Sequence, residues 1–169
     1  MRSPLASLSI ALVAALTFAA CSASSPPTEK AMDRGGPRID TVSAVVVTVN
    51  PRLPSDKQTR FENAEGPSRL ERSLEAKLSQ TGRLRRDSPN VLEVDVTSYR
   101  MRSGAAVFWV GAMAGADALG VTVTIRDGSG IVRTFPTGAA SIGAYAGLDQ
   151  VSRLERLVEA TALRILNDL

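Results

Sequence analysis

Apolar and polar residues alternate along two stretches in the second half of the chain. In 91–97 and again in 121–126, every second residue is Leu, Val or Ile, and most residues between them are charged or Thr. A period of two is typical of a strand with one face on a core and the other in water. Asp127-Gly128-Ser129-Gly130 supplies residues that tolerate positive φ, and apolar residues resume at Ile131. We therefore predict two facing strands followed by a β-hairpin.

An earlier strand is predicted between Ser43 and Asn50, where β-branched residues dominate and Pro51 ends the run. Four successive apolar residues, 44–47, suggest that this strand is buried on both faces and lies centrally in the sheet. The stretch 51–67 is polar and contains three prolines. It is predicted to be mostly loop, with room for a short helical turn around 60–64.

Two amphipathic helices are predicted from apolar residues spaced three or four apart. In the first, Leu70, Leu74 and Leu78 form one stripe. Ser68 and Glu71 have the spacing of a capping box that opens this helix, and Gly82 fits the left-handed position that closes it.

The second helix is predicted from about Asp149 to Leu166, opened by a Ser152–Glu155 capping box or by Asp149 one turn earlier. Its stripe consists of Val151, Leu154, Val158, Ala162 and Ile165. The sequences 68–76 (SRLERSLEA) and 152–160 (SRLERLVEA) agree at seven of nine positions. Two hypotheses explain the match: an internal duplication, or convergence of two capped helices in a chain rich in Arg and Leu. The preceding strands do not match, which favours convergence.

The predicted order is therefore β-α-β-β-β-α, an α+β fold (an α/β sandwich). It has a small mixed sheet of about four strands, with the two helices packed on one face. We assign residues 41–169 to this single domain, which is long enough to bury a core without disulfides.

The N-terminus predicts export. Arg2 precedes an apolar run of small residues from Leu5 to Ala20, which is typical of a secretory signal and shorter than the roughly 20 residues of a membrane-spanning helix. The alternatives are a retained anchor or an ordinary cut near Ala23. Phe18-Ala19-Ala20-Cys21 resembles the bacterial lipoprotein signal, with Phe18 where Leu is usual. We therefore expect residues 1–20 to be removed and Cys21, the single cysteine, to be lipidated.

Residues 21–40 are predicted to form the lipidated cysteine and a flexible tether, because they are rich in Ser, Pro and Gly and have little to bury. Several acyl chains anchor a protein stably, since each buried methylene contributes about 0.8 kcal/mol. Ser22, rather than Asp, follows the cysteine. By resemblance to enterobacterial lipoproteins, this favours the inner leaflet of the outer membrane, with the domain facing the periplasm.

Composition argues against several classes of function. The chain has no histidine, the side chain most used for proton transfer near neutral pH and the commonest metal ligand. One cysteine cannot form an intramolecular disulfide, and a net charge of +3 is too small to indicate a nucleic-acid binder. Glu93 and Asp95 share a strand face, where solvated carboxylates are the usual case. We therefore expect no enzyme activity, no metal or other cofactor, and no nucleic-acid partner.

The least ordinary stretch is 104–119, which is rich in Gly and Ala and contains Phe108 and the single tryptophan, Trp109. It either packs over the sheet as part of the core or leaves an apolar patch for a partner or a second copy. A similar stretch, 138–147, contains Tyr145, which could extend such a patch. Arg100 and Arg102 are either solvated or attract anionic lipid or glycan groups. The candidate interaction surface is thus Phe108, Trp109, Arg100, Arg102 and Tyr145.

With these pieces in order, the chain resembles bacterial lipoproteins of the domain of unknown function 4410 type. The resemblance lies in the run 103–119, Ser-Gly-Ala-Ala-Val-Phe-Trp-Val-Gly-Ala-Met-Ala-Gly-Ala-Asp-Ala-Leu, and in Val-Thr-Val-Thr-Ile-Arg-Asp at 121–127 with the turn after it. A Gly-rich segment and a terminal helix follow, so the likeness spans roughly Val42 to Leu169. It implies an envelope lipoprotein with a compact α/β domain and no established activity.

We therefore expect a membrane-anchored, non-enzymatic module that binds another envelope protein or assembles with copies of itself. The alternative is a periplasmic domain that binds a small ligand or a glycan through the Gly-rich segments and Arg100 or Arg102.

Overall fold

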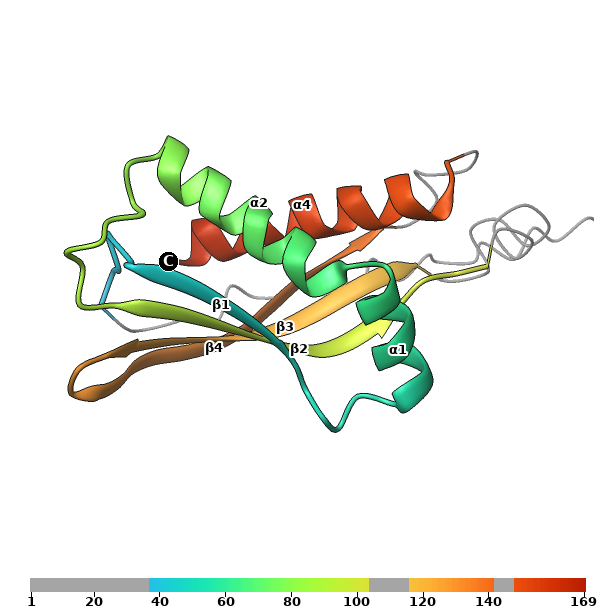
Figure 1. Cartoon of the computed structure of the whole chain (residues 1–169), viewed down its shortest axis with the longest axis horizontal. Coiled ribbons are helices and arrows are strands. Elements are labelled where there is room, and N and C mark those ends of the chain that lie inside the picture. The colour runs from blue at the N-terminus through green and yellow to red at the C-terminus, as the bar shows by residue number, and fades with distance from the viewer. Residues whose placement is uncertain (1–36, 104–115, 142–147) are drawn as a thin grey trace, which may run out of the picture. The chain divides into compact units, whose positions relative to one another are not determined.

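The computed structural model describes residues 37–103, 116–141 and 148–169. The described elements follow the order β1 (Ala44–Val49), α1 (Ser55–Asn63), α2 (Gly66–Gln80), β2 (Val91–Arg100), β3 (Asp117–Asp127), β4 (Gly130–Ser141) and α4 (Gln150–Asp168). The strands form one mixed sheet in the order β1-β2-β3-β4, with β1 parallel to β2 and the other pairs antiparallel (Figure 1). The expected α+β class with a four-stranded mixed sheet is confirmed.

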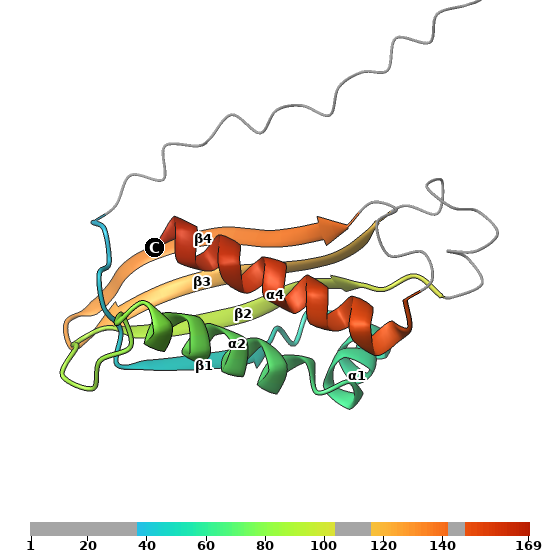
Figure 2. The same ribbon diagram turned by 90° about the horizontal axis from the view of Figure 1, so that it is seen from above.

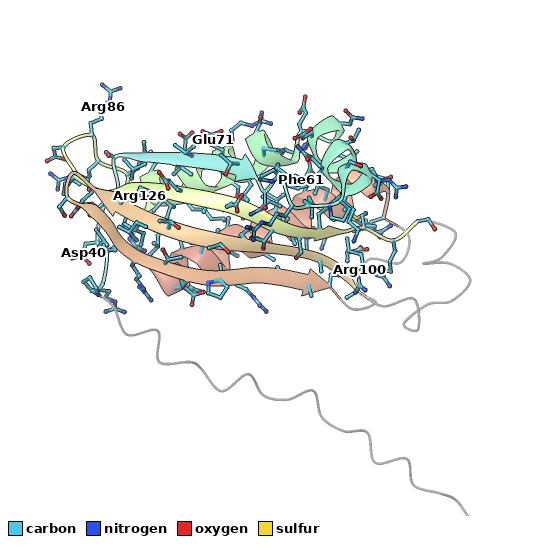
Figure 3. The ribbon with its side chains drawn as sticks, turned by 90° about the horizontal axis from the view of Figure 1, so that it is seen from below. Asp40, Phe61, Glu71, Arg86, Arg100 and Arg126 are labelled. Atoms are coloured by element: carbon cyan, nitrogen blue, oxygen red, sulfur yellow. The ribbon has the colours of Figure 1, made fainter. Side chains whose placement is uncertain are left out.

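Helices α2 and α4 lie side by side on one face of the sheet (Figure 2). The apolar stripe of α2, with Leu70, Leu74 and Leu78, is fully buried against the strands, as the spacing predicted. The strand residues facing these helices are the alternating apolar ones of the sequence pattern, such as Leu92, Val94 and Val123. The other face of the sheet carries no helix among the described residues (Figure 3).

Helix α1 forms where the sequence predicted mostly loop. Its residues are polar except for Phe61, which is fully buried and whose ring centroid lies 4.9 Å from that of Tyr99. Gly66 permits the close approach of α2, because a Cβ there would lie 2.3 Å from the Phe61 ring. One aromatic anchor thus holds an otherwise polar helix, which a periodicity search over the segment does not detect.

The prediction that the first strand is central is wrong, because β1 is an edge strand. Val46 points away from the helices and is 43% exposed, whereas Val45 is buried. The run of valines reflects β propensity along an edge rather than burial on both faces.

The caps at the starts of α2 and α4 differ from the predicted capping boxes. Helix α2 begins at Gly66 after Glu65, which has a left-handed φ of 55° and makes no side-chain cap bond, so Ser68 does not open it. Helix α4 is capped by Asp149, whose carboxylate accepts the Ser152 N–H at 2.9 Å. The Ser152–Glu155 alternative is therefore wrong and the Asp149 alternative is confirmed. Gly82, with φ of +68°, follows α2 as predicted.

The predicted hairpin is confirmed. Strands β3 and β4 meet at the pair Asp127–Gly130, and the Asp127 carboxylate accepts the backbone N–H groups of Ser129 and Gly130 at 2.8 and 3.1 Å. Strand β3 begins at Asp117, four residues earlier than the alternation predicted. This extension brings a charged residue into the inward row of the sheet.

Candidate functional site

Three strands and a helix meet at the end of the sheet opposite the β3–β4 hairpin. Strand β2 ends there at Arg100, and Asp117, the first residue of β3, pairs with Ser141, the last residue of β4 (Figure 1). The first turns of α4 lie over the same end (Figure 2). Residues 104–115 and 142–147, which the structure does not describe, join these elements in sequence.

A buried ionic cluster holds this end together. Asp117 is fully buried and points toward the helices, because it shares a strand face with Leu119 and Val121. Its carboxylate accepts hydrogen bonds from Arg153 Nε and Nη2 at 2.9 and 2.6 Å, and from Arg102 Nε and backbone N–H at 3.2 and 2.9 Å. We call Asp117, Arg102 and Arg153 the Asp117 cluster.

The Asp117 cluster connects the helix layer to the sheet. Arg153 also donates from Nη2 to the Arg102 carbonyl at 3.1 Å, so α4 is bonded both to β3 and to the chain just beyond β2. Both arginines are more than nine-tenths buried. One helix side chain thereby fixes the ends of two strands relative to each other.

The charges of the cluster keep Asp117 ionised. Burial by itself raises the pKa of a carboxyl, but the hydrogen bonds from Arg153 and Arg102 outweigh burial, and the pKa of Asp117 lies below its usual value. Removing one partner of such a buried group leaves a charge without compensation and is strongly destabilising. The cluster is therefore a bracing element that depends on all three members.

Two hydroxyls make this end of the core more polar. Tyr99 and Ser141 are buried on the inward face, and within the described part of the chain their oxygens have no hydrogen-bond partner. Burial raises the pKa of Tyr99, and the negative charge of Asp117 adds to the effect. The phenol is therefore neutral over the physiological pH range.

The structure separates the two arginines that the sequence grouped in one candidate surface. Arg100 is exposed and donates from Nε to the Ala116 carbonyl at 2.8 Å, which ties the end of β2 to the start of β3 (Figure 3). Arg102 is buried and bonded to Asp117, so its guanidinium is part of the core rather than of an exposed surface. Phe108, Trp109, Tyr145 and the expected lipidation residue Cys21 lie outside the described residues.

Sequence reasoning missed Asp117 and Arg153 as site residues. Asp117 is the single charge in the apolar run 104–119, and a lone charge there is a signal for a buried partner. Arg153 precedes Leu154 on the apolar side of its helix. Because the same Ser-Arg-Leu-Glu-Arg motif occurs in α2, the local sequence does not distinguish Arg153 from Arg69.

The strand carboxylates that resembled an acid/base pair have separate partners. Glu93 accepts from Arg126 Nε at 2.7 Å, and Asp95 accepts from the Asn50 amide at 2.5 Å, both on the face that the helices leave uncovered. Their bonding is that of ordinary surface carboxylates.

Within the described ranges, no helix is long and apolar enough to cross a membrane.

Comparison with known proteins identifies one family. The model of a domain of unknown function (DUF4410) matches residues 23–155, which is most of the span over which the resemblance was expected. No curated protein sequence matches the chain.

Several solved structures are similar in fold. A PelC dodecamer from Paraburkholderia phytofirmans is 22% identical over 75% of this chain and 88% of its own, with a TM-score of 0.44. A minor lipoprotein from Acinetobacter baumannii is 16% identical over 76% and 91% of the two chains, with a TM-score of 0.40. A DUF330 protein from Xanthomonas campestris is 11% identical over 75% and 80%, with a TM-score of 0.46. At these identities the likeness is one of fold alone.

Proposed function

The chain belongs to the DUF4410 family, and from that premise we propose that it is a lipid-anchored protein of the bacterial envelope that works by binding rather than by catalysis. Its partner is another envelope protein or further copies of itself. The N-terminal sequence supports the anchor, because a short signal ends at Cys21 and a Ser-, Pro- and Gly-rich tether follows. The domain then faces the periplasm from the inner leaflet of the outer membrane.

The observation that carries the proposal is the Asp117 cluster, which braces the end of the sheet to which the two Gly-rich segments attach. A binding surface gains affinity when its supports are ordered before the partner arrives. The cluster supplies such order, because it joins the end of β2, the start of β3 and the first turns of α4 through buried, charge-assisted bonds. The segments attached there contain Phe108, Trp109 and Tyr145, and aromatic residues are typical anchors of interfaces.

The chemistry of the same end supports binding over catalysis. Guanidinium groups stay protonated and neither accept nor release protons near neutral pH. Both oxygens of Asp117 are occupied by arginine donors, and its lowered pKa keeps it from acting as an acid. With no histidine in the chain, this end lacks the groups that general acid–base catalysis uses most.

The proposal is tested by cross-linking intact membranes that carry the full chain, followed by purification and identification of the captured proteins. We expect one stoichiometric envelope protein, or a second copy, with the native sequence. The double variant Phe108→Ser, Trp109→Ser should fold with an unchanged melting temperature and lose the captured protein. A control, Ile131→Ser, removes an exposed apolar residue at the hairpin end and should keep it.

Three results would count against this function. Capture that persists in the double variant places the contact elsewhere, and a double variant that no longer folds places Phe108 and Trp109 in the core. A native chain that captures no protein, but melts at a higher temperature when acidic glycans are added, favours the glycan-binding alternative. In that case Arg100→Gln should weaken the glycan effect.

A further inference from the structure

The chain enters the described domain at the end of the sheet that carries the β3–β4 hairpin. The Ile39 N–H donates to the Leu169 carbonyl at 2.9 Å, and Arg83 Nε donates to the Asp40 carbonyl at 3.1 Å. These bonds hold the entering segment against the C-terminal residue and the loop before β2. The point where the N-terminal residues join the domain is therefore fixed.

The hairpin lies at the same end as this entry point. One row of paired residues crosses the sheet from the start of β1: Ala44 pairs with Val91, Val91 with Arg126, and Arg126 with Ile131. Adjacent strands are about 4.8 Å apart, so the row spans about 15 Å. We call residues 37–43, 81–91 and 124–134, which surround this row, the tether end.

The tether end is basic. Its residues include six arginines and three acids, namely Arg38, Arg83, Arg85, Arg86, Arg126 and Arg133 with Asp40, Asp87 and Asp127. Arg38 and Arg86 are exposed, and Figure 3 shows Arg86 projecting from this end, with Arg100 at the opposite end of the molecule. This end of the domain therefore presents excess positive charge to solvent.

Ion pairs within the tether end do not cancel this charge. Arg85 and Asp87 form a surface pair at 2.8 Å, and Arg126 pairs with Glu93 at 2.7 Å. Arg83 donates to two main-chain carbonyls, which carry no charge. Even with both pairs set aside, arginines outnumber aspartates at this end.

An apolar side chain lies among these bases. Ile131 follows the hairpin turn and is 59% exposed, the highest value for a large apolar side chain in the described part of the molecule. One exposed apolar residue is ordinary by itself. Here it lies at the same end as the exposed Arg38 and Arg86, a combination suited to an anionic membrane. The apolar residue enters the headgroup region, and the bases are attracted to the lipid phosphates.

We infer that the tether end rests on the anionic lipid surface to which the chain is attached, so that the end braced by the Asp117 cluster points away from the membrane. This inference rests on the lipid attachment at Cys21 in the function proposed above. Residues 22–36 separate Cys21 from the domain, and a tether of this length spans about 20 Å. The braced end lies at the other end of β3, about 35 Å from the hairpin.

The tether allows a weak contact to be sufficient. A short linker holds the domain at an effective concentration of about a millimolar beside the membrane. Several arginines attracted to anionic lipid, together with one inserted isoleucine, then favour the docked state. In that orientation the segments joined to the braced end face the periplasm, where the partner of the proposed function lies.

The test attaches the chain from Cys21 onward to lipid vesicles. The Cys21 thiol is coupled to a maleimide-bearing lipid, which supplies the anchor chemically and keeps the natural tether length. A fluorescent amino acid replaces Gly128, where an added Cβ meets nothing within 4 Å, and brominated lipids quench it on contact. The matched position is Ser55, which is exposed at the start of α1. With phosphatidylglycerol in the vesicles we expect quenching at position 128 and not at 55, and little at either with phosphatidylcholine alone.

Substitutions at the tether end should weaken docking. Arg86→Gln should lower the ratio of docked to undocked chains about fivefold, and Ile131→Ser should lower it by a similar factor. The control Arg52→Gln removes an exposed base near α1 and should leave the ratio unchanged. All three side chains are exposed, so the melting temperature should not change.

Three outcomes would each overturn the inference: equal quenching at positions 128 and 55, equal quenching in the two kinds of vesicle, or an Arg52→Gln loss as large as that of Arg86→Gln. None of them bears on the capture of a partner that tests the proposed function, because the anchor here is synthetic. Conversely, a chain whose Cys21 receives no lipid in cells would remove the proposed anchor and leave the vesicle result unchanged.

Discussion

Helices α2 and α4 contain nearly the same nine residues at the same helical position, yet the structure uses them differently. Ser68 and Ser152 are each the third residue of their helix, so the two copies of the motif align by position as well as by sequence. In both helices the residue after the shared arginine, Leu70 or Leu154, is buried. The motif thus fixes a helix and the face that it buries.

The shared arginine shows where the likeness ends. Arg69 forms a surface ion pair with Glu155 at 2.7 Å, whose side chains are 26% and 58% exposed. Arg153 reaches Asp117 at 2.6 Å with side chains 2% and 0% exposed. The same residue in the same local sequence is a surface charge in one helix and a core brace in the other, because only α4 begins over the end of β3.

The largest expected difference comes from removing each arginine. Arg153→Ala leaves Asp117 buried with fewer donors and should lower the free energy of unfolding by about 3–5 kcal/mol. Arg69→Ala loses an exposed pair and should cost about 0–1 kcal/mol. Urea unfolding of the two variants measures both values. Equal losses would show that the buried cluster is no more than an ordinary ion pair.

The dependence of stability on acid pH should also distinguish the buried Asp117 cluster from the surface pair of Arg69. The pKa of Asp117 is lower in the folded chain than in the unfolded one, so its contribution is complete above the unfolded pKa and is lost as the pH falls through the folded pKa. Unfolding followed below about pH 4 should therefore show a loss of stability that is reduced in Asp117→Asn. Arg69→Ala, which leaves the cluster intact, should keep the native profile. An Asp117→Asn profile identical to the native one would contradict this account.

Substitutions at the two helix caps should change the melting temperature by smaller amounts and in opposite directions. Glu65 has a left-handed φ and no cap bond, so Glu65→Gly should remove backbone strain of about 1 kcal/mol and raise the melting temperature. Asp149 has an extended conformation and accepts the Ser152 N–H and hydroxyl at 2.9 and 2.8 Å. Asp149→Gly should therefore lower the melting temperature. Calorimetry of both variants would refute the cap assignment if the two shifts had the same sign.

The sequence predicted those parts of the fold whose signal is local. Alternation identified β2 and β3, the turn residues identified the hairpin, and apolar spacing identified α2 and α4. Helix α1 was missed because its one buried residue, Phe61, gives no periodic pattern. The edge position of β1 was missed because strand order depends on pairing between distant segments.

The candidate site was also predictable only in part, because its members are far apart in the sequence. Arg100 and Arg102 were grouped in one candidate surface, but their different environments depend on Asp117 and Arg153, which are 15 and 51 residues from Arg102 in the chain. A spacing of two along an extended chain cannot show which arginine turns inward at the end of a strand. The lone Asp117 in an apolar run was the available clue.

The central claim is that the braced end of the sheet carries the binding surface of a lipid-anchored protein. Its most direct test replaces Trp109 with a photo-cross-linking amino acid in the full chain and irradiates living cells. The account predicts a covalent product with one envelope protein or a second copy, lost when Cys21→Ser releases the chain from the membrane. A folded, membrane-bound chain that forms no product from this position would contradict it.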